Sequence, residues 1–238
     1  MNAQSTIDKS GAYFISQCKD FREPPPSSKA GQLKPTITIS HQIGAGAPEI
    51  AGRLTGLLQE SELKGDRPWA LYSHHLIENA LVEQQLPKRL AGKITEEKRF
   101  FLHELIDDVF DLQPPSWVLM PRVREITLRL ATAGHAVLVG YGVTVVTAQL
   151  SNVYHVRLTG SLSRRIERVQ KLETLTLEAA SKFIRTEDRK RNKFLKAHFH
   201  TRLENELLYD LAINTDRISD EDAVALIFKG AKRFFARQ

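Results

Sequence analysis

The chain has 238 residues and one cysteine, and its 34 Lys and Arg against 28 Asp and Glu give a formal net charge of +6. A single cysteine excludes a disulfide scaffold, and no stretch approaches the roughly 20 apolar residues that a membrane span needs. The N-terminus has no basic-then-apolar signal pattern, so we expect a reduced, cytoplasmic setting and no membrane partner. The net positive charge favours anionic partners such as nucleotides or nucleic acid, but it does not distinguish between these two.

Residues 1–34 are predicted to be an N-terminal extension. The three prolines at 24–26, followed by serines and a glycine, are incompatible with a helix or a central strand. We therefore expect the folded domain to cover residues 36–238.

Short β-branched or apolar runs alternate along this domain with segments whose apolar residues recur at helical spacing. A helical block over residues 74–134 follows the second strand, and Gly134 is its expected end. Ser161 and Ser219 are expected helix N-caps. The alternation predicts a three-layer α/β fold, with a parallel sheet covered by helices on both faces. Strands are expected at 36–40, 69–72, 136–140, 153–159 and 211–214, and a long charged helix at 177–197.

The turn after the first strand, Gly44-Ala45-Gly46-Ala47-Pro48, is the most informative segment. A strand, a glycine turn and a helix form the usual setting of a phosphate-binding loop, because glycines admit the phosphates and helix-start N–H groups face the anion. A tight turn with no ligand explains the same residues, and from the turn alone the two interpretations weigh equally.

Further segments, in the same order along the chain, extend this pattern. They are TITIS to IA (36–51), GYG (140–142), VRL to RIERV (156–169), EDRKR (187–191) and YDLAINTDRISDEDAV (209–224). Together they resemble the cytidylate-kinase-like family, a branch of the P-loop nucleoside monophosphate kinases. The resemblance covers roughly residues 36–230 and is most specific at 209–224.

The resemblance implies a kinase that transfers the γ-phosphate of ATP to a nucleoside monophosphate, CMP-like, or to a similar acceptor, with Mg²⁺ as the metal. The acceptor would bind among the helices of 74–134, on the side of Tyr141 and Asp188. A lid at 177–197 would close over both substrates. Its arginines would supply transition-state charge, and Asp188 would orient them. The implied lid arginines are Arg185, Arg189 and Arg191, and the implied nucleotide-binding residues are Gly44, Ala45, Gly46, Ala47, Pro48 and Glu49.

By spacing, Arg185, Asp188 and Arg189 share one helical face, and Arg191 lies on a neighbouring face. A solvated charged helix is the competing interpretation of this run.

Two segments, the loop and the strand end, depart from the family pattern. The lysine of the usual phosphate loop is absent, and Pro48 stands where this branch has an arginine. Tyr141 stands where the family has an arginine at the strand end. Such losses favour an alternative function, a catalytically weakened kinase-fold protein that senses nucleotides or binds other proteins.

Other partners rank lower. Acids interleave with the bases of the charged helix, so nucleic-acid binding ranks well behind the two kinase-fold hypotheses. The pairs His74-His75 and His198–His200 match no zinc spacing, and we predict no metal site built from protein ligands alone.

Overall fold

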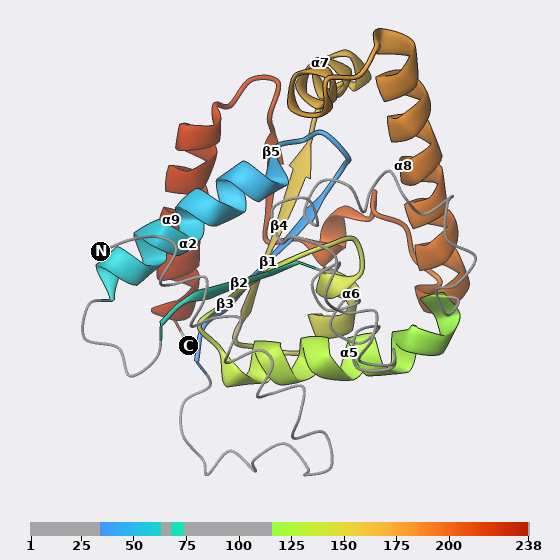
Figure 1. Cartoon of the computed structure of the whole chain (residues 1–238). Helices are drawn as coiled ribbons and strands as arrows, with labels where there is room; N and C mark the ends of the chain where they lie inside the picture. The colour runs from blue at the N-terminus through green and yellow to red at the C-terminus, as the bar shows by residue number, and fades with distance from the viewer. Residues whose placement is uncertain (1–33, 63–67, 74–115, 238) are drawn as a thin grey trace, which may run out of the picture. The chain divides into compact units, whose positions relative to one another are not determined.

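The computed structural model describes residues 34–62, 68–73 and 116–237 (Figure 1). The chain divides into two compact units, residues 1–27 with 73–126, and residues 28–72 with 127–238. Of the first unit, the described residues are Ser73 and the start of α5 (Ser116–Ala133), which carries Pro121 within the helix. The predictions for the extension and for most of the helical block fall outside the described residues.

The second unit contains a five-stranded sheet in the order β2-β3-β1-β4-β5 (Figure 1). β1 pairs in parallel with β3 and β4, and β4 pairs in parallel with β5, which confirms the predicted parallel sheet. In such a sheet, the carboxyl ends of the strands meet at one edge, and ligands bind there. The strands are β1 (Thr36–His41), β2 (Ala70–Ser73), β3 (Ala136–Val139), β4 (Val153–Thr159) and β5 (Leu211–Asn214).

One face of the sheet is apolar. Ile37 and Ile39 of β1 are fully buried against α2 (Ala47–Ser61) and α9 (Asp220–Phe235). Their alternation with polar residues follows from the two-residue period of a strand. This face forms the main hydrophobic core of the unit, to which β3, β4 and β5 contribute Val137, Val139, Val156, Leu158 and Ile213.

The opposite face of the sheet is buried but polar. Thr36 Oγ1 donates to the carbonyl of Ala131 at 3.0 Å, and Thr38 Oγ1 lies 2.8 Å from His155 Nδ1. Ser40 is also fully buried on this face. Buried hydroxyls need partners, so this face is organised by specific hydrogen bonds more than by packing alone.

The remaining helices follow the predicted caps. Ser161 Oγ accepts from the N–H of Arg164 at the start of α7 (Leu162–Glu173), and Ser219 Oγ accepts from the N–H of Asp222 at the start of α9. The charged helix α8 (Leu177–Phe199) follows α7 and packs against it. Two short helices, α6 (Val143–Thr147) and η1 (Glu206–Leu208), were not predicted, because each is too short for helical periodicity to register.

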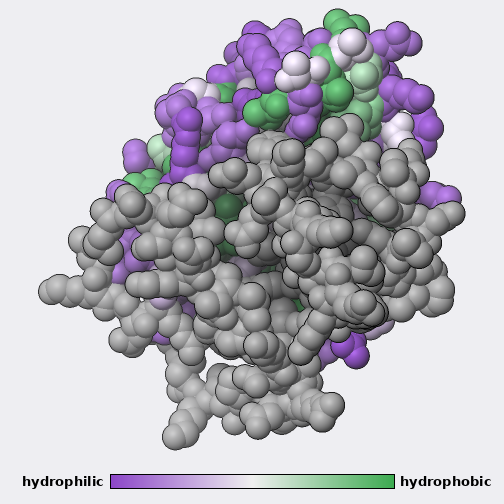
Figure 2. Space-filling view, in the orientation of Figure 1, coloured by the Kyte–Doolittle hydropathy of each residue, from purple (hydrophilic) through white to green (hydrophobic). Residues whose placement is uncertain are grey.

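The described surface is mostly hydrophilic on the face shown in Figure 2, with hydrophobic side chains gathered near the α7–α8 junction. Leu172 and Leu177, which are 46% and 66% exposed, lie at this junction. Among the described helices, none is both long and apolar enough to cross a membrane.

Candidate functional site

The turn after β1 adopts a conformation that requires glycine at two positions. Gly44 and Gly46 have φ angles of 77° and 82°, in the left-handed region. A Cβ on Gly44 would lie 2.6 Å from the carbonyl oxygen of Arg165, so the loop backbone packs directly on α7. The predicted glycine turn between β1 and α2 is therefore confirmed, while its binding of phosphate stays a prediction.

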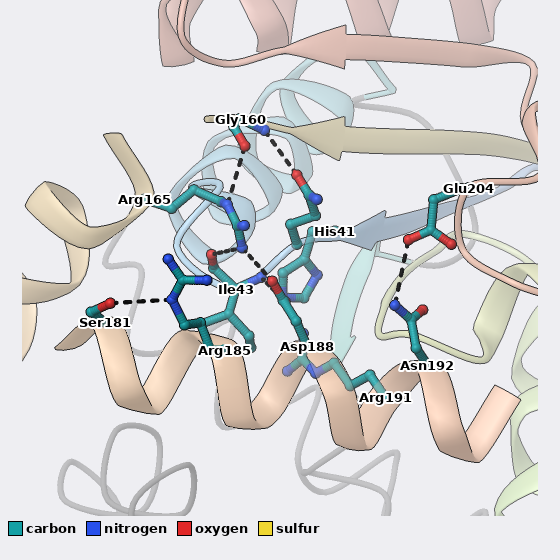
Figure 3. Close-up of polar contacts among 11 residues, drawn as sticks. His41, Ile43, Gly160, Arg165, Ser181, Arg185, Asp188, Arg191, Asn192 and Glu204 are labelled. Carbon is teal, nitrogen blue, oxygen red and sulfur yellow. Dashed lines mark hydrogen bonds and ion pairs between the residues drawn. The ribbon is translucent and has the colours of Figure 1, made fainter. Parts of the chain in front are cut away.

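The turn is anchored to the end of β4 through Gln42. The N–H of Gln42 donates to the carbonyl of Leu158 at 3.1 Å, and its side-chain oxygen accepts from the N–H of Gly160 at 3.1 Å (Figure 3). The N–H of Ala45 closes the turn by donating to the carbonyl of Gln42 at 3.0 Å. These bonds fix the loop in place before any ligand binds, which is the preorganisation that an anion site needs.

Asp188 of α8 connects the charged helix to the loop. Its Oδ1 accepts from the N–H of Ile43 at 3.4 Å, and its Oδ2 lies 2.7 Å from Nη1 of Arg165 (Figure 3). Arg165 also donates from Nε to the carbonyl of Gly160 and from Nη1 to the carbonyl of Ile43. Its side chain is 8% exposed, so one guanidinium joins the loop, α7 and α8 in a largely buried network.

A second guanidinium lies across the loop at Gly46. Arg168 Nη2 donates to Asp220 Oδ1 at 3.0 Å, at the start of α9. Its Nη1 occupies the place that a Cβ on Gly46 would take, and this buried nitrogen has no hydrogen-bond partner within the described ranges. A buried, unpartnered cationic donor beside a glycine loop fits a phosphate oxygen.

The residues fit a magnesium ion less fully. Glu49 Oε2, in the first turn of α2, is buried without a hydrogen-bond partner in the described part of the chain. No group of three metal-ligating side chains occurs among the described residues. A divalent ion at this loop would therefore take most of its ligands from phosphate oxygens and water, and Glu49 is the one carboxylate of the loop segment 41–49 that could join them.

α8 turns only part of its predicted arginine set toward the sheet. Arg191 is 5% exposed and its Nη1 lies 3.5 Å from His41 Nε2, whereas Arg185 and Arg189 are exposed. Arg185 donates to Ser181 on its own helix at 3.5 Å (Figure 3). The spacing places Asp188 on one face with Arg185 and Arg189, but in the structure Asp188 is partly buried whereas the two arginines are exposed.

The ion-pair partner of Asp188 also differs from the expectation. The resemblance implies that Asp188 orients the arginines of its own helix, whereas its ion pair is with Arg165 of α7. Helical spacing alone cannot indicate such a pair, because it joins two elements. The catalytic roles of Arg185, Arg189 and Arg191 stay predictions.

Tyr141, at the end of β3, packs under α8. The Arg191 guanidinium lies 5.3 Å from its ring centroid, and Phe194 meets the same ring edge-on at 5.1 Å. Tyr141 thus positions a cation by a cation–π contact, where the family pattern has a cation at the strand end itself. Its binding of an acceptor stays a prediction.

Besides Arg165 and Arg168, the sequence reasoning missed a further buried charge. Arg157 of β4 is 4% exposed, and its Nη1 lies 3.1 Å from Ser40 Oγ on the polar face of the sheet. The available signal was an arginine inside an otherwise buried strand, VYHVRLT. Within a parallel sheet such a charge needs a reason, since burying it is costly.

Comparisons with known proteins identify the family and the fold. The model of the cytidylate kinase-like family matches residues 36–217. An uncharacterized protein from Eubacterium ventriosum has a similar fold, with a TM-score of 0.61 and 15% identity over 84% of this chain and 99% of that one.

Two weaker structural similarities are to kinases. A shikimate kinase from Bacteroides thetaiotaomicron gives a TM-score of 0.46, with 12% identity over 85% of this chain and 97% of that one. A gluconokinase from Sinorhizobium meliloti gives 0.44, with 15% identity over 87% and 94%. Curated proteins give no match.

Proposed function

The chain belongs to the cytidylate kinase-like family, and on this premise we propose that it transfers the γ-phosphate of ATP to a nucleoside monophosphate, CMP-like, or to a similar phosphate-bearing acceptor. The observation that carries the proposal is the buried Nη1 of Arg168, which lies against Gly46 without a hydrogen-bond partner among the described residues. Leaving a buried cationic N–H group without a hydrogen bond costs free energy, and a phosphate oxygen would accept that hydrogen bond.

Three arginines from two helices converge around the loop. Arg165 and Arg168 come from α7, and Arg191 comes from α8. Phosphoryl transfer needs alignment and positive charge more than covalent help, and one arginine at the transferred group is worth roughly 10³ to 10⁵ in rate. These side chains are our candidates to replace the lysine that the loop lacks. Bound ATP supplies the phosphoryl group.

The loop itself explains why a lysine is replaced from outside. Ala47 is fully buried at the first position of α2, so a lysine at this position has no room for its stem without repacking. Pro48, which follows, is exposed and lacks an N–H group. The phosphate-binding loop therefore has one N–H donor fewer, and its positive charge must come from the arginines of α7 and α8.

A second candidate function rests on Asp188. Its carboxylate already accepts from the Ile43 N–H and pairs with Arg165, two groups that a phosphate would otherwise use. If Asp188 keeps these two contacts when nucleotide is present, the protein is the catalytically weakened kinase-fold protein, a nucleotide-sensing or protein-interaction module without turnover. In either case we expect a cytoplasmic protein, and for the kinase and the nucleotide sensor we expect small nucleotides as partners.

A thermal melt with millimolar ATP and Mg²⁺ tests the first candidate. A ligand that binds only the folded state adds about 2.7 kcal/mol of stability at a hundredfold excess over Kd. We expect a clear rise in Tm for the wild type and a much smaller rise for Arg168→Met. The control is Arg164→Met, which removes the same charge from an exposed position on the same helix.

A phosphotransfer assay over an acceptor panel that includes CMP follows the melts. Transfer to a monophosphate supports the kinase, and ATP binding without transfer supports the module. No rise in Tm with any nucleotide would refute both nucleotide-binding functions. Binding that weakens steeply with salt and is competed by single-stranded DNA would instead favour a nucleic-acid partner.

A further inference from the structure

The exposed face of α8 carries a row of positive side chains. Ala180, Ile184 and Leu195 are fully buried and mark the inner face of this helix. On the outer side, exposed basic residues recur at intervals of three or four, so they form one stripe along the helix axis. This set, the α8 stripe, consists of Lys182, Arg185, Arg189, Lys193 and Lys196.

The acids of the helix do not neutralise the α8 stripe. Glu187 is 14% exposed and pairs with Lys190, and Asp188 pairs with Arg165 of α7 (Figure 3). Both acids are partly buried, and within the described ranges no carboxylate pairs with a residue of the stripe. Acids and bases alternate along the sequence, which ranks nucleic-acid binding low, but on the folded surface the stripe is exposed and entirely basic.

The α8 stripe does not serve the stability of the helix. Its members stand three or four residues apart, where like charges repel, whereas an ordinary exposed helix places acids and bases at this spacing. The inner face already packs α8 against α7 through Ile184 and Val169. An unpaired row of like charges therefore favours a partner that brings negative charge.

The composition of this surface distinguishes among anionic partners. From Lys182 to Lys196, every exposed residue of α8 except Thr186 is basic. A helix that lies in a membrane surface needs an apolar face, and a protein interface needs apolar or aromatic residues at its centre. Single-stranded nucleic acid stacks its bases on aromatic side chains. The backbone of a duplex requires only suitably spaced cations.

The length of the α8 stripe fits a short stretch of duplex. At 1.5 Å per residue, Lys182 and Lys196 are about 21 Å apart along the helix axis. One strand of a B-form duplex carries a phosphate every 3.4 Å or so of its axis, so about six phosphates fall within this length. Five cations can therefore each face a phosphate.

We propose that the α8 stripe binds the phosphate backbone of double-stranded nucleic acid without sequence preference. The proposal goes beyond the proposed function and does not depend on it, because the lysines of the stripe belong neither to the glycine loop nor to the arginines around it. It gives the positive charge of this helix a use on its outer face, while Asp188 and Arg191 serve the inner one.

The test measures binding of the full chain to a fluorescently labelled DNA duplex about two turns long, by anisotropy, at several salt concentrations. Glutamine replaces bases because its helix propensity is similar to that of lysine. The stripe variant is Lys182→Gln/Lys193→Gln/Lys196→Gln. The control loses the same charge from exposed positions on and just after α9. The control variant is Lys229→Gln/Arg233→Gln/Arg237→Gln.

The expected result is a change in salt dependence. Five phosphate contacts give a slope of about −4.5 for log K against log [salt], so wild type and control should bind about 500-fold more weakly at 200 mM than at 50 mM salt. The stripe variant keeps two contacts, so its slope should be about −1.8, a loss of about tenfold over the same range. At 50 mM salt it should bind at least tenfold more weakly than the control.

Two further variants separate charge from structure. Lys182→Arg/Lys193→Arg/Lys196→Arg keeps the charge and should bind the duplex as wild type does. The urea midpoint of the glutamine stripe variant should equal that of wild type or exceed it, because like charges are removed from one face. If that variant does not fold, Lys182→Gln/Lys196→Gln replaces it, with an expected slope of about −2.7.

Other polyanions are separated by parallel probes. An RNA duplex of the same length should also bind, since it offers the same backbone charge. Tighter binding to phosphatidylserine vesicles or to a polyglutamate peptide than to either duplex would assign the stripe to a membrane or an acidic protein and overturn the proposal. So would equal duplex binding by the stripe and control variants, or no duplex binding by wild type at 50 mM salt. A wild type that ATP does not stabilise bears on the proposed function alone.

Discussion

Asp188→Asn tests whether the contact between α8 and the loop stabilises the fold. The substitution removes the negative charge opposite Arg165 but keeps an oxygen that can accept from the Ile43 N–H. Breaking a buried ion pair by changing one partner costs about 3–5 kcal/mol, because the other charge is left uncompensated. The Arg165 side chain is 8% exposed, but that of Asp188 is 27% exposed, so water screens part of the interaction.

We therefore expect Asp188→Asn to lower the free energy of unfolding by about 1–2 kcal/mol, and Asp188→Ala, which also loses the acceptor for Ile43, by about 2–3 kcal/mol. With a urea m-value of about 2 kcal/mol per molar, the first loss shifts the midpoint by about 0.5–1 M. The assay is urea unfolding followed by circular dichroism, with the m-value fitted for each variant.

The control is Glu167→Gln on α7, the helix that carries Arg165. Glu167 pairs with Arg164 at 3.2 Å, and the two side chains are 54% and 65% exposed. An exposed i,i+3 pair contributes at most about 0.5 kcal/mol, so this variant loses the same charge with little effect.

A double-mutant cycle with Arg165→Met isolates the pair itself. We expect a coupling energy of about 1 kcal/mol or more between Asp188 and Arg165, since they share a direct ion pair of 2.7 Å. Stability of Asp188→Asn within 0.5 kcal/mol of wild type, together with zero coupling, would refute this account of the loop.

Two further predictions concern the loop and its surroundings. Gly46→Ala should destabilise the protein by more than about 1 kcal/mol, because its φ is 82° and the new Cβ meets Arg168. Gly52→Ala, in the open interior of α2, should stabilise it by about 0.5–1 kcal/mol, and thermal melts of the pair check both signs. Hydrogen bonds from Ser161 lower the pKa of Asp216 below its ordinary 3.8, so its contribution to stability is present at neutral pH and is lost as the pH falls through the lowered value. The urea midpoints of wild type and Asp216→Asn should therefore differ at pH 7 and draw together as the pH falls below about 4, and a difference that does not narrow there would contradict the assignment.

The sheet could be predicted from the sequence because its signals are local. The run from Thr36 to Ile39 is β-branched throughout, and its alternation of isoleucine with hydroxyl residues, continued by Ser40, matches the two buried faces of β1. Gly134 ends α5 with a φ of 74°, and Ser161 and Ser219 cap their helices as expected. Each of these signals lies within one element or at its end, where residue chemistry acts directly on the backbone.

The side-chain contacts that join different elements at the site could not be predicted in the same way. Asp188 lies 23 residues from Arg165, and Arg157 lies 117 residues from Ser40, so neither contact leaves a periodic pattern. Helical spacing indicates which side chains share a face, but the tertiary fold determines which face is buried. Arg185 and Arg189 match a lid pattern as well as Arg191 does, and only packing against β1 separates them.

The departures at Pro48 and Tyr141 and the buried charge of Arg157 bear on the same question, whether this site still binds anions. A loop that had lost its ligand would also lose any pressure to keep a buried charge, because replacing such a charge by an apolar side chain is often neutral or stabilises by about 1–4 kcal/mol. Arg157 is nevertheless buried in the middle of a parallel sheet, held by one hydroxyl and one ring. A role in binding an anion would explain this placement, which stability alone does not. If Arg157→Met is both more stable than wild type and unable to bind phosphate, the chain trades stability for anion binding. If it is less stable and binds CMP unchanged, Arg157 is a structural residue, and the weakened module becomes the better account of the fold.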